Sequence, residues 1–159
     1  MTAWATDELT KMGRAEEIEI AVRRADGQLH NRVTVWAVPH GDALYVRSAV
    51  KGRNAAWFRA VPEMHEGRIW AGGLEKDIAF EDADHDIDDE VDAAYRSKYR
   101  RYAGRILNSC LTPEARSTTI KIVARRPKWC RPLDVFSGRS NQLRSGRPLF
   151  LHHRLQIAL

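Results

Sequence analysis

The sequence lacks a long apolar run and a signal peptide. None of its 159 residues fall in an apolar stretch near the roughly 18 residues that a membrane span needs. Charged residues near the amino end, Asp7, Glu8 and Lys11, stand where a signal peptide would be apolar. We therefore expect a cytoplasmic protein with no membrane partner.

Cysteine is scarce, and the usual catalytic and metal-binding signatures are missing. Cys110 and Cys130 are spaced neither as a metal-ligand pair nor as a disulfide framework, so we expect both to be free. The histidines lack zinc-site spacing, and the acidic run from Asp82 to Asp88 lacks the glycine and glutamate of a calcium loop. No Gly-x-Ser-x-Gly elbow or Ser/His/Asp arrangement is present. We predict no metal and no catalytic side chain.

The excess of positive charge is confined to one end of the chain. Lys and Arg number 26 against 21 Asp and Glu, a net charge of +5. Residues 1–126 contain 20 of each sign, so all of the excess lies in residues 127–159. A balanced body argues against a dedicated nucleic-acid domain. A basic arm for nucleic acid or an anionic surface stays open for the end segment.

The length and composition indicate one globular domain followed by a tail. Residues 1–126 hold the periodic segments, whereas residues 127–159 are rich in Arg, Ser and Pro. We expect the tail to be mostly disordered. It is either a fused or frame-shifted end, or a native segment with a short amphipathic helix that docks elsewhere.

Hydrophobic periodicity predicts a mainly β fold with helices. Alternating or β-branched segments predict six strands, at 17–23, 32–38, 44–48, 68–71, 77–81 and 118–125, with a hairpin turn at Gly72-Gly73. Helical spacing predicts a short helix over 3–14 and another over 55–61, which Pro62 stops. It also predicts one long helix over 87–107, and Thr112-Pro113 ends that helical region. Six antiparallel strands with frequent turns favour a small β-barrel, because closure protects the sheet edges.

The long predicted helix carries most of the ambiguous side chains. Its first turns are acidic and its later turns basic, which predicts a solvated face with pairs such as Asp92 with Arg96. Tyr95, Tyr99 and Tyr102 fit either a core or a pocket wall, and the spacing does not distinguish the two.

Several short motifs in a fixed order resemble a known family. They are RADG at 24–27, VWAV at 35–38, LYVRS at 44–48, GRNAAW at 52–57, GG at 72–73 and AYRSKY at 94–99. Together they resemble the uncharacterised domain-of-unknown-function family two-two-five-five, over roughly residues 4–126. That family is similar to the split-barrel FMN-binding proteins and the deazaflavin-dependent nitroreductases. The resemblance implies a six-stranded split barrel, commonly a homodimer, with FMN or a deazaflavin at the barrel mouth.

The residues of these motifs suit such a cofactor. A phosphate needs several cations or N–H donors, which Arg47, Ser48, Lys51, Gly52 and Arg53 could supply beside a helix N-terminus. A planar ring needs an apolar wall, for which the candidates are Trp36, Tyr45 and Trp57.

Two functions from different classes follow from this resemblance. The first is an oxidoreductase that acts on a small organic acceptor. The loop order Lys51-Gly52-Arg53-Asn54 departs from the Lys-Ser or Arg-Lys pairing of the cofactor-using relatives. The second is therefore a cofactor-free small-ligand binding or dimeric structural module.

Overall fold

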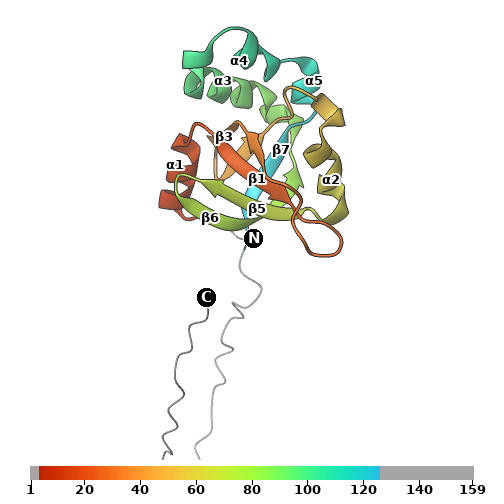
Figure 1. The fold of residues 1–159 in the computed structure, drawn as a ribbon. Coiled ribbons are helices and arrows are strands. Elements are labelled where there is room, and N and C mark those ends of the chain that lie inside the picture. Colours follow the sequence, from red (N-terminus) through yellow and green to blue (C-terminus); the bar gives the residue numbers. More distant parts are fainter. Residues whose placement is uncertain (1–3, 126–159) are drawn as a thin grey trace, which may run out of the picture.

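The computed structural model describes residues 4–125, in which seven strands form one antiparallel sheet that curls into a barrel (Figure 1). The sheet order is β2-β1-β5-β6-β7-β4-β3. The strands are β1 (Ile18–Val22), β2 (Val33–Val35), β3 (Ala37–His40), β4 (Ala43–Val46), β5 (Glu66–Ala71), β6 (Leu74–Asp82) and β7 (Ile120–Ala124). The mainly β barrel architecture with helices is confirmed, and the predictions for residues 127–159 lie outside the described residues.

The predicted count of six strands is wrong because one strand bends at Trp36. Residues Val33–Val35 pair with β1, and residues Ala37–His40 pair with β4 at the other edge of the sheet. A single residue thus joins the two edge strands and brings the barrel close to closure. The change of partner leaves Trp36 between two strands, where its side chain is not fixed by a cross-strand neighbour on either side.

The predicted Gly72-Gly73 hairpin is confirmed. Ala71 pairs with Leu74, so the loop has two residues, with φ values of +56° and +78°. A two-residue turn with positive φ at both positions matches the right-handed twist of the strands, and glycine adopts it without steric cost.

The predicted long helix is divided into shorter helices, whereas the helix predicted over 55–61 extends to Met64. The helices are α1 (Thr6–Arg14), α2 (Ala56–Met64), α3 (Asp88–Lys98), α4 (Arg105–Ser109) and α5 (Pro113–Arg116), with 3₁₀ turns η1 (Gly52–Asn54), η2 (His85–Ile87) and η3 (Arg100–Tyr102). The single long helix over 87–107 is wrong: the chain turns through η3 and through Gly104, whose φ is +116°. That backbone conformation is open to glycine and closed to most other residues.

The predictions that Pro62 stops a helix and that Thr112-Pro113 ends a helical region are both wrong, and for the same reason. Pro62 lies inside α2, and His65, the residue that follows the helix, adopts the left-handed conformation. Pro113 begins α5, where Oγ1 of Thr112 caps the helix by accepting a 3.1 Å hydrogen bond from the N–H of Ala115. Proline removes one donor but does not forbid a helix close to its ends, and it suits the first helical position.

The apolar side chains form two cores. The larger core fills the barrel and takes in side chains of α1 and α2. The smaller one lies between β3 and β4 on one side and α3 and α4 on the other, and contains Tyr95 and Tyr99. These two tyrosines are therefore core residues, and neither lines the cavity described below.

The basic end of the predicted long helix is not a uniformly solvated face. The Nζ of Lys98 donates a 2.6 Å hydrogen bond to the carbonyl of Ala37. Burial of this ammonium group lowers the pKa of Lys98 to about 8. Arg101 instead pairs across the fold with Glu16 at 3.0 Å.

Among residues 4–125, no helix is long and apolar enough to cross a membrane.

Candidate functional site

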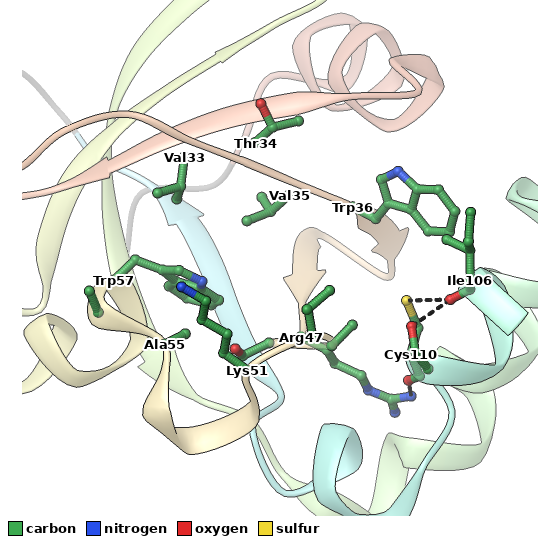
Figure 2. Close-up of a pocket in the computed structure, with 15 residues that line it drawn as sticks. Val33, Thr34, Val35, Trp36, Arg47, Lys51, Ala55, Trp57, Ile106 and Cys110 are labelled. Carbon is green, nitrogen blue, oxygen red and sulfur yellow. Dashed lines mark hydrogen bonds between the residues drawn. The ribbon is translucent and has the colours of Figure 1, made fainter.

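A cavity of about 480 Å³ lies between β2, the segment after β4, the start of α2, and α4 (Figure 2). Small-molecule sites typically occupy about 300–1,000 Å³. The lining is mainly apolar, with Val33 and Val35 on one side and Ile106 of α4 on another. At its edge, Val50 is 91% exposed and Ile106 60% exposed. The site is suited to a ligand with a large apolar surface.

Two tryptophans line the cavity, and each is held by another ring. Trp36 stacks on Tyr99 with ring centroids 4.2 Å apart and an interplanar angle of 5°. Trp57 meets Phe58 edge to face at 5.9 Å. Since each indole lines the cavity and packs against a second ring, the two can form walls for a planar ligand.

The start of α2 offers positive potential to the same cavity. Ala55, its N-cap residue, has no side-chain oxygen to accept from the first-turn N–H groups, and that turn contains no acidic residue. Ala55, Ala56 and Trp57 all line the cavity, as does Lys51. Free N–H groups at a helix N-terminus beside an ammonium group favour an anion.

The structure brings together five of the eight residues that the sequence nominated for the cofactor. The residues that line the cavity are Trp36, Arg47, Ser48, Lys51 and Trp57. Tyr45, Gly52 and Arg53 do not line it, and Tyr45 is buried in the smaller core. Gly52 packs against α5, since a Cβ there would meet the carboxylate of Glu114. Arg53 is exposed and donates to the carbonyl of Ser117 at 3.4 Å.

Arg47 turns its charged group away from the cavity. Its side chain is 0% exposed, and Nη1 donates to the carboxylate of Asp92 and to the carbonyl of Cys110, the latter at 3.0 Å. Figure 2 shows the guanidinium pointing toward Cys110 and away from Lys51 and Trp57. Arg47 and Arg53 therefore have separate partners, and their charges do not converge on one ligand position.

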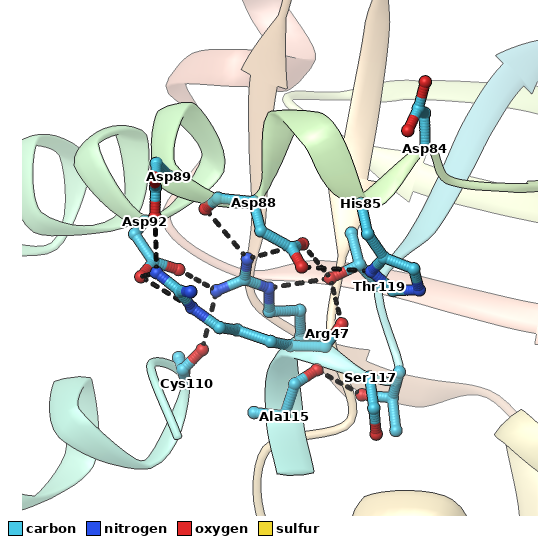
Figure 3. Close-up of polar contacts among 12 residues, drawn as sticks. Arg47, Asp84, His85, Asp88, Asp89, Asp92, Cys110, Ala115, Ser117 and Thr119 are labelled. Atoms are coloured by element: carbon cyan, nitrogen blue, oxygen red, sulfur yellow. Dashed lines mark hydrogen bonds and ion pairs between the residues drawn. The ribbon is translucent and has the colours of Figure 1, made fainter. Parts of the chain in front are cut away.

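The ion pairs around Asp92 differ from the prediction (Figure 3). Asp92 pairs with Arg47 and with Arg116, so the predicted pair with Arg96 is wrong. Asp92 lies on the same face of α3 as Tyr95 and Tyr99 and is 2% exposed, whereas Arg96 is exposed. An acid at a buried position of a helix must find a partner on another element, because its own helix neighbours along the exposed face cannot reach it.

The pKa of Asp92 responds to two opposing influences. Burial raises it, but the hydrogen bonds from Arg116 and Arg47 outweigh burial and lower the pKa below its ordinary value of 3.8. A depressed folded-state pKa stabilises the protein above the ordinary value, and that contribution is lost as the pH falls through the folded value.

We therefore expect acid to destabilise the protein partly through Asp92. Urea unfolding measured between pH 7 and pH 2 should show the free energy of unfolding falling below about pH 4. The decline should be shallower in Asp92→Asn than in the wild type, and Asp89→Asn, on the 88% exposed neighbour, should keep the wild-type slope. Equal slopes in all three proteins would contradict the assignment.

Periodicity does not indicate the α4 wall. It places Ile106 on the apolar face of the predicted long helix and assigns Ser109 and Cys110 no role in a site, because the break at Gly104 that brings α4 over the cavity is not evident from the spacing of apolar residues. Cys110 is a free thiol, and burial raises its pKa. Within residues 4–125, no group of three or more His, Cys, Asp or Glu side chains is arranged to hold a metal ion.

Comparison with known proteins gives a family and several distant structures. No curated protein matches the chain. Similar solved structures include "Structure of F420-H2 Dependent Reductase (FDR-A)", with 14% identity, a TM-score of 0.47, and coverage of 68% of this chain and 93% of that one. Another is the conserved hypothetical protein Rv2991 from Mycobacterium tuberculosis, with 13% identity, a TM-score of 0.49, and coverage of 79% and 83%. Identity at this level carries no information on what this chain binds.

The family assignment rests on the sequence match. The model of the family described as "Uncharacterized protein conserved in bacteria (DUF2255)" matches residues 8–122, which is most of the chain and nearly all of the described barrel. The chain belongs to the DUF2255 family.

Proposed function

We propose that the chain binds a flavin or deazaflavin coenzyme in the 480 Å³ cavity and uses it in an oxidoreductase reaction on a small organic acceptor. The observation that carries this proposal is the combination of two braced indoles with one ammonium group and an uncapped helix N-terminus in a single cavity. A phosphorylated planar ring presents the complementary features.

The residues divide into a ring side and a phosphate side. Trp36 and Trp57, together with Val35, would bound the ring system. Lys51 and the first N–H groups of α2 would hold the phosphate. When bound, the ring supplies hydride or electron transfer, and the chain contributes binding, orientation and exclusion of water.

A second candidate is supported by the position of Arg47. Its guanidinium is neutralised by Asp92, so Lys51 is the one cationic side chain of the cavity lining, within the described residues, whose charge is not already paired. A site with so few cations also suits a cofactor-free binding module for an apolar ligand with one weakly anionic group. Titration with FMN, riboflavin and a reduced deazaflavin distinguishes the two functions.

The phosphate side makes a specific prediction. Lys51→Ala should weaken FMN binding about tenfold, because a charge-assisted contact to the phosphate is lost. It should leave riboflavin binding unchanged, since riboflavin has no phosphate. Calorimetric or fluorescence titration gives both dissociation constants, and Lys11→Ala on the exposed face of α1 is the matched control.

Two results would count against the proposal. If neither flavin nor deazaflavin binds at high micromolar concentrations, the coenzyme function is removed and the binding module remains. If Lys51→Ala weakens FMN and riboflavin equally, Lys51 does not contact the phosphate.

A further inference from the structure

Arg47 holds together the elements behind the cavity. Its five N–H donors all have acceptors: Nε donates to Thr119 Oγ1 at 2.9 Å, and Nη2 reaches the carbonyl and carboxylate of Asp88 at 3.3 Å each. Nη1 donates to Asp92 and to the carbonyl of Cys110. Figure 3 shows these contacts radiating from the guanidinium to α3, to the end of α4 and to the start of β7. No donor is left for a ligand.

The contact with Cys110 is the important one for the cavity. Cys110 is the C-cap residue of α4, and α4 supplies Ile106, Ser109 and Cys110 to the cavity lining. Among the described residues, the bond from Arg47 is the one hydrogen bond that joins residues 105–110 to any part of the chain outside residues 104–112. The apolar anchoring of α4 is limited to Leu107 and Cys110, since Ile106 is largely exposed.

We propose that Arg47 is a positioning residue that fixes α4, and with it one wall of the cavity, rather than a ligand of the phosphate. A short helix with two buried side chains has little stability of its own. The buried guanidinium adds to the stability that this limited packing provides. It donates a hydrogen bond to the terminal carbonyl of α4, and its own charge is balanced by Asp92 on α3. This role depends on the cavity alone and is independent of which ligand the cavity takes.

The two roles for Arg47 give different ligand profiles if the proposed function is correct. A phosphate ligand would discriminate between FMN and riboflavin, as Lys51 should. A positioning residue affects binding through the placement of α4 in the cavity wall, so Arg47→Lys should weaken the binding of both compounds by the same factor. Selective loss of FMN binding would overturn the positioning role.

Thiol labelling tests the proposal without any coenzyme. The full chain carrying Cys130→Ser is treated with an aromatic disulfide reagent, so that Cys110, 4% exposed, is the one thiol that reacts. Arg47→Lys keeps a positive charge for Asp92 but cannot span Asp88, Thr119 and the carbonyl of Cys110. Its labelling rate should rise about tenfold or more, the equivalent of one charge-assisted hydrogen bond.

The matched control is Arg116→Lys. Arg116 also binds Asp92 but makes no hydrogen bond or ion pair with residues 105–110, so the labelling rate of Arg116→Lys should stay within about twofold of the wild type. The rate for Arg47→Lys should be nearly independent of low urea concentrations, because only α4 opens and little surface is exposed. Should Arg47→Lys not fold, Thr119→Val removes the acceptor of Nε and should give a smaller rise of the same kind.

Three outcomes would overturn the proposal. They are a wild-type labelling rate in folded Arg47→Lys, an equal rise in Arg116→Lys, and a rate that grows with urea as steeply as global unfolding does. The last would show that Arg47 stabilises the whole fold without a particular effect on α4.

Discussion

Asp92→Ala is expected to lower the free energy of unfolding by about 3–5 kcal/mol. The substitution leaves the guanidinium of Arg47 fully buried, with the carboxylate of Asp88 at 3.3 Å as its remaining counter-charge. Leaving a buried charge without its partner destabilises the fold by far more than the intact pair stabilises it, because the charge has then lost both water and partner. Urea denaturation monitored by tryptophan fluorescence measures the difference, provided the m-value is unchanged.

Asp89→Ala is the matched control for this prediction. Asp89 lies on the same helix and pairs with the same Arg116 at 2.8 Å, but its side chain is 88% exposed. Screening by water makes such a pair nearly neutral, so its removal should cost a small fraction of the loss in Asp92→Ala. A double replacement, Arg47→Met with Asp92→Leu, should recover part of the stability, since neither charge of the buried pair is then left without the other; the carboxylate of Asp88, which loses Arg47, keeps His85 at 3.0 Å. Equal losses for Asp89→Ala and Asp92→Ala would contradict the account.

The parts of the fold that were predictable are those that depend on neighbours in sequence. Alternation of apolar residues located the strands, and two glycines in a row located the β5–β6 hairpin. The bend at Trp36 was not predictable in this way, because Val33 through Val38 are uniformly suited to a strand. Which strand each half pairs with is decided by closure of the barrel, a property of the whole sheet.

The candidate site likewise has a part that the sequence predicts and a part that it does not. The motifs that carried the family resemblance led to Trp36, Lys51 and Trp57, and the structure brings these to one cavity. The partners of Arg47 could not be identified, because Asp92 and Cys110 follow it by 45 and 63 residues. One signal was available: Asp92 falls in phase with Tyr95 and Tyr99, and a carboxylate on an apolar helix face indicates a buried cationic partner.

Tyr99→Ala should be the other strongly damaging substitution, with a loss of about 3–5 kcal/mol. Tyr99 is fully buried in the smaller core, where its ring lies flat against Trp36. Its hydroxyl donates to the carbonyl of Glu16 at 2.8 Å and also lies 3.3 Å from the carbonyl of Ala37. Truncation removes the stack, the hydrogen bonds and the packing together, and the cavity that remains adjoins the indole that lines the binding site.

Tyr99→Phe separates the ring from the hydroxyl. It keeps the stack on Trp36 and should cost about 1–2 kcal/mol for the lost hydrogen bond. Because the position of Trp36 is then preserved, FMN affinity should stay within about twofold of the wild type. In Tyr99→Ala, studied at low temperature where it remains folded, the indole can rotate into the void and FMN affinity should fall at least tenfold. Unchanged FMN binding in folded Tyr99→Ala would mean that the stack does not fix the wall, and that Trp36 is held by its backbone between β2 and β3.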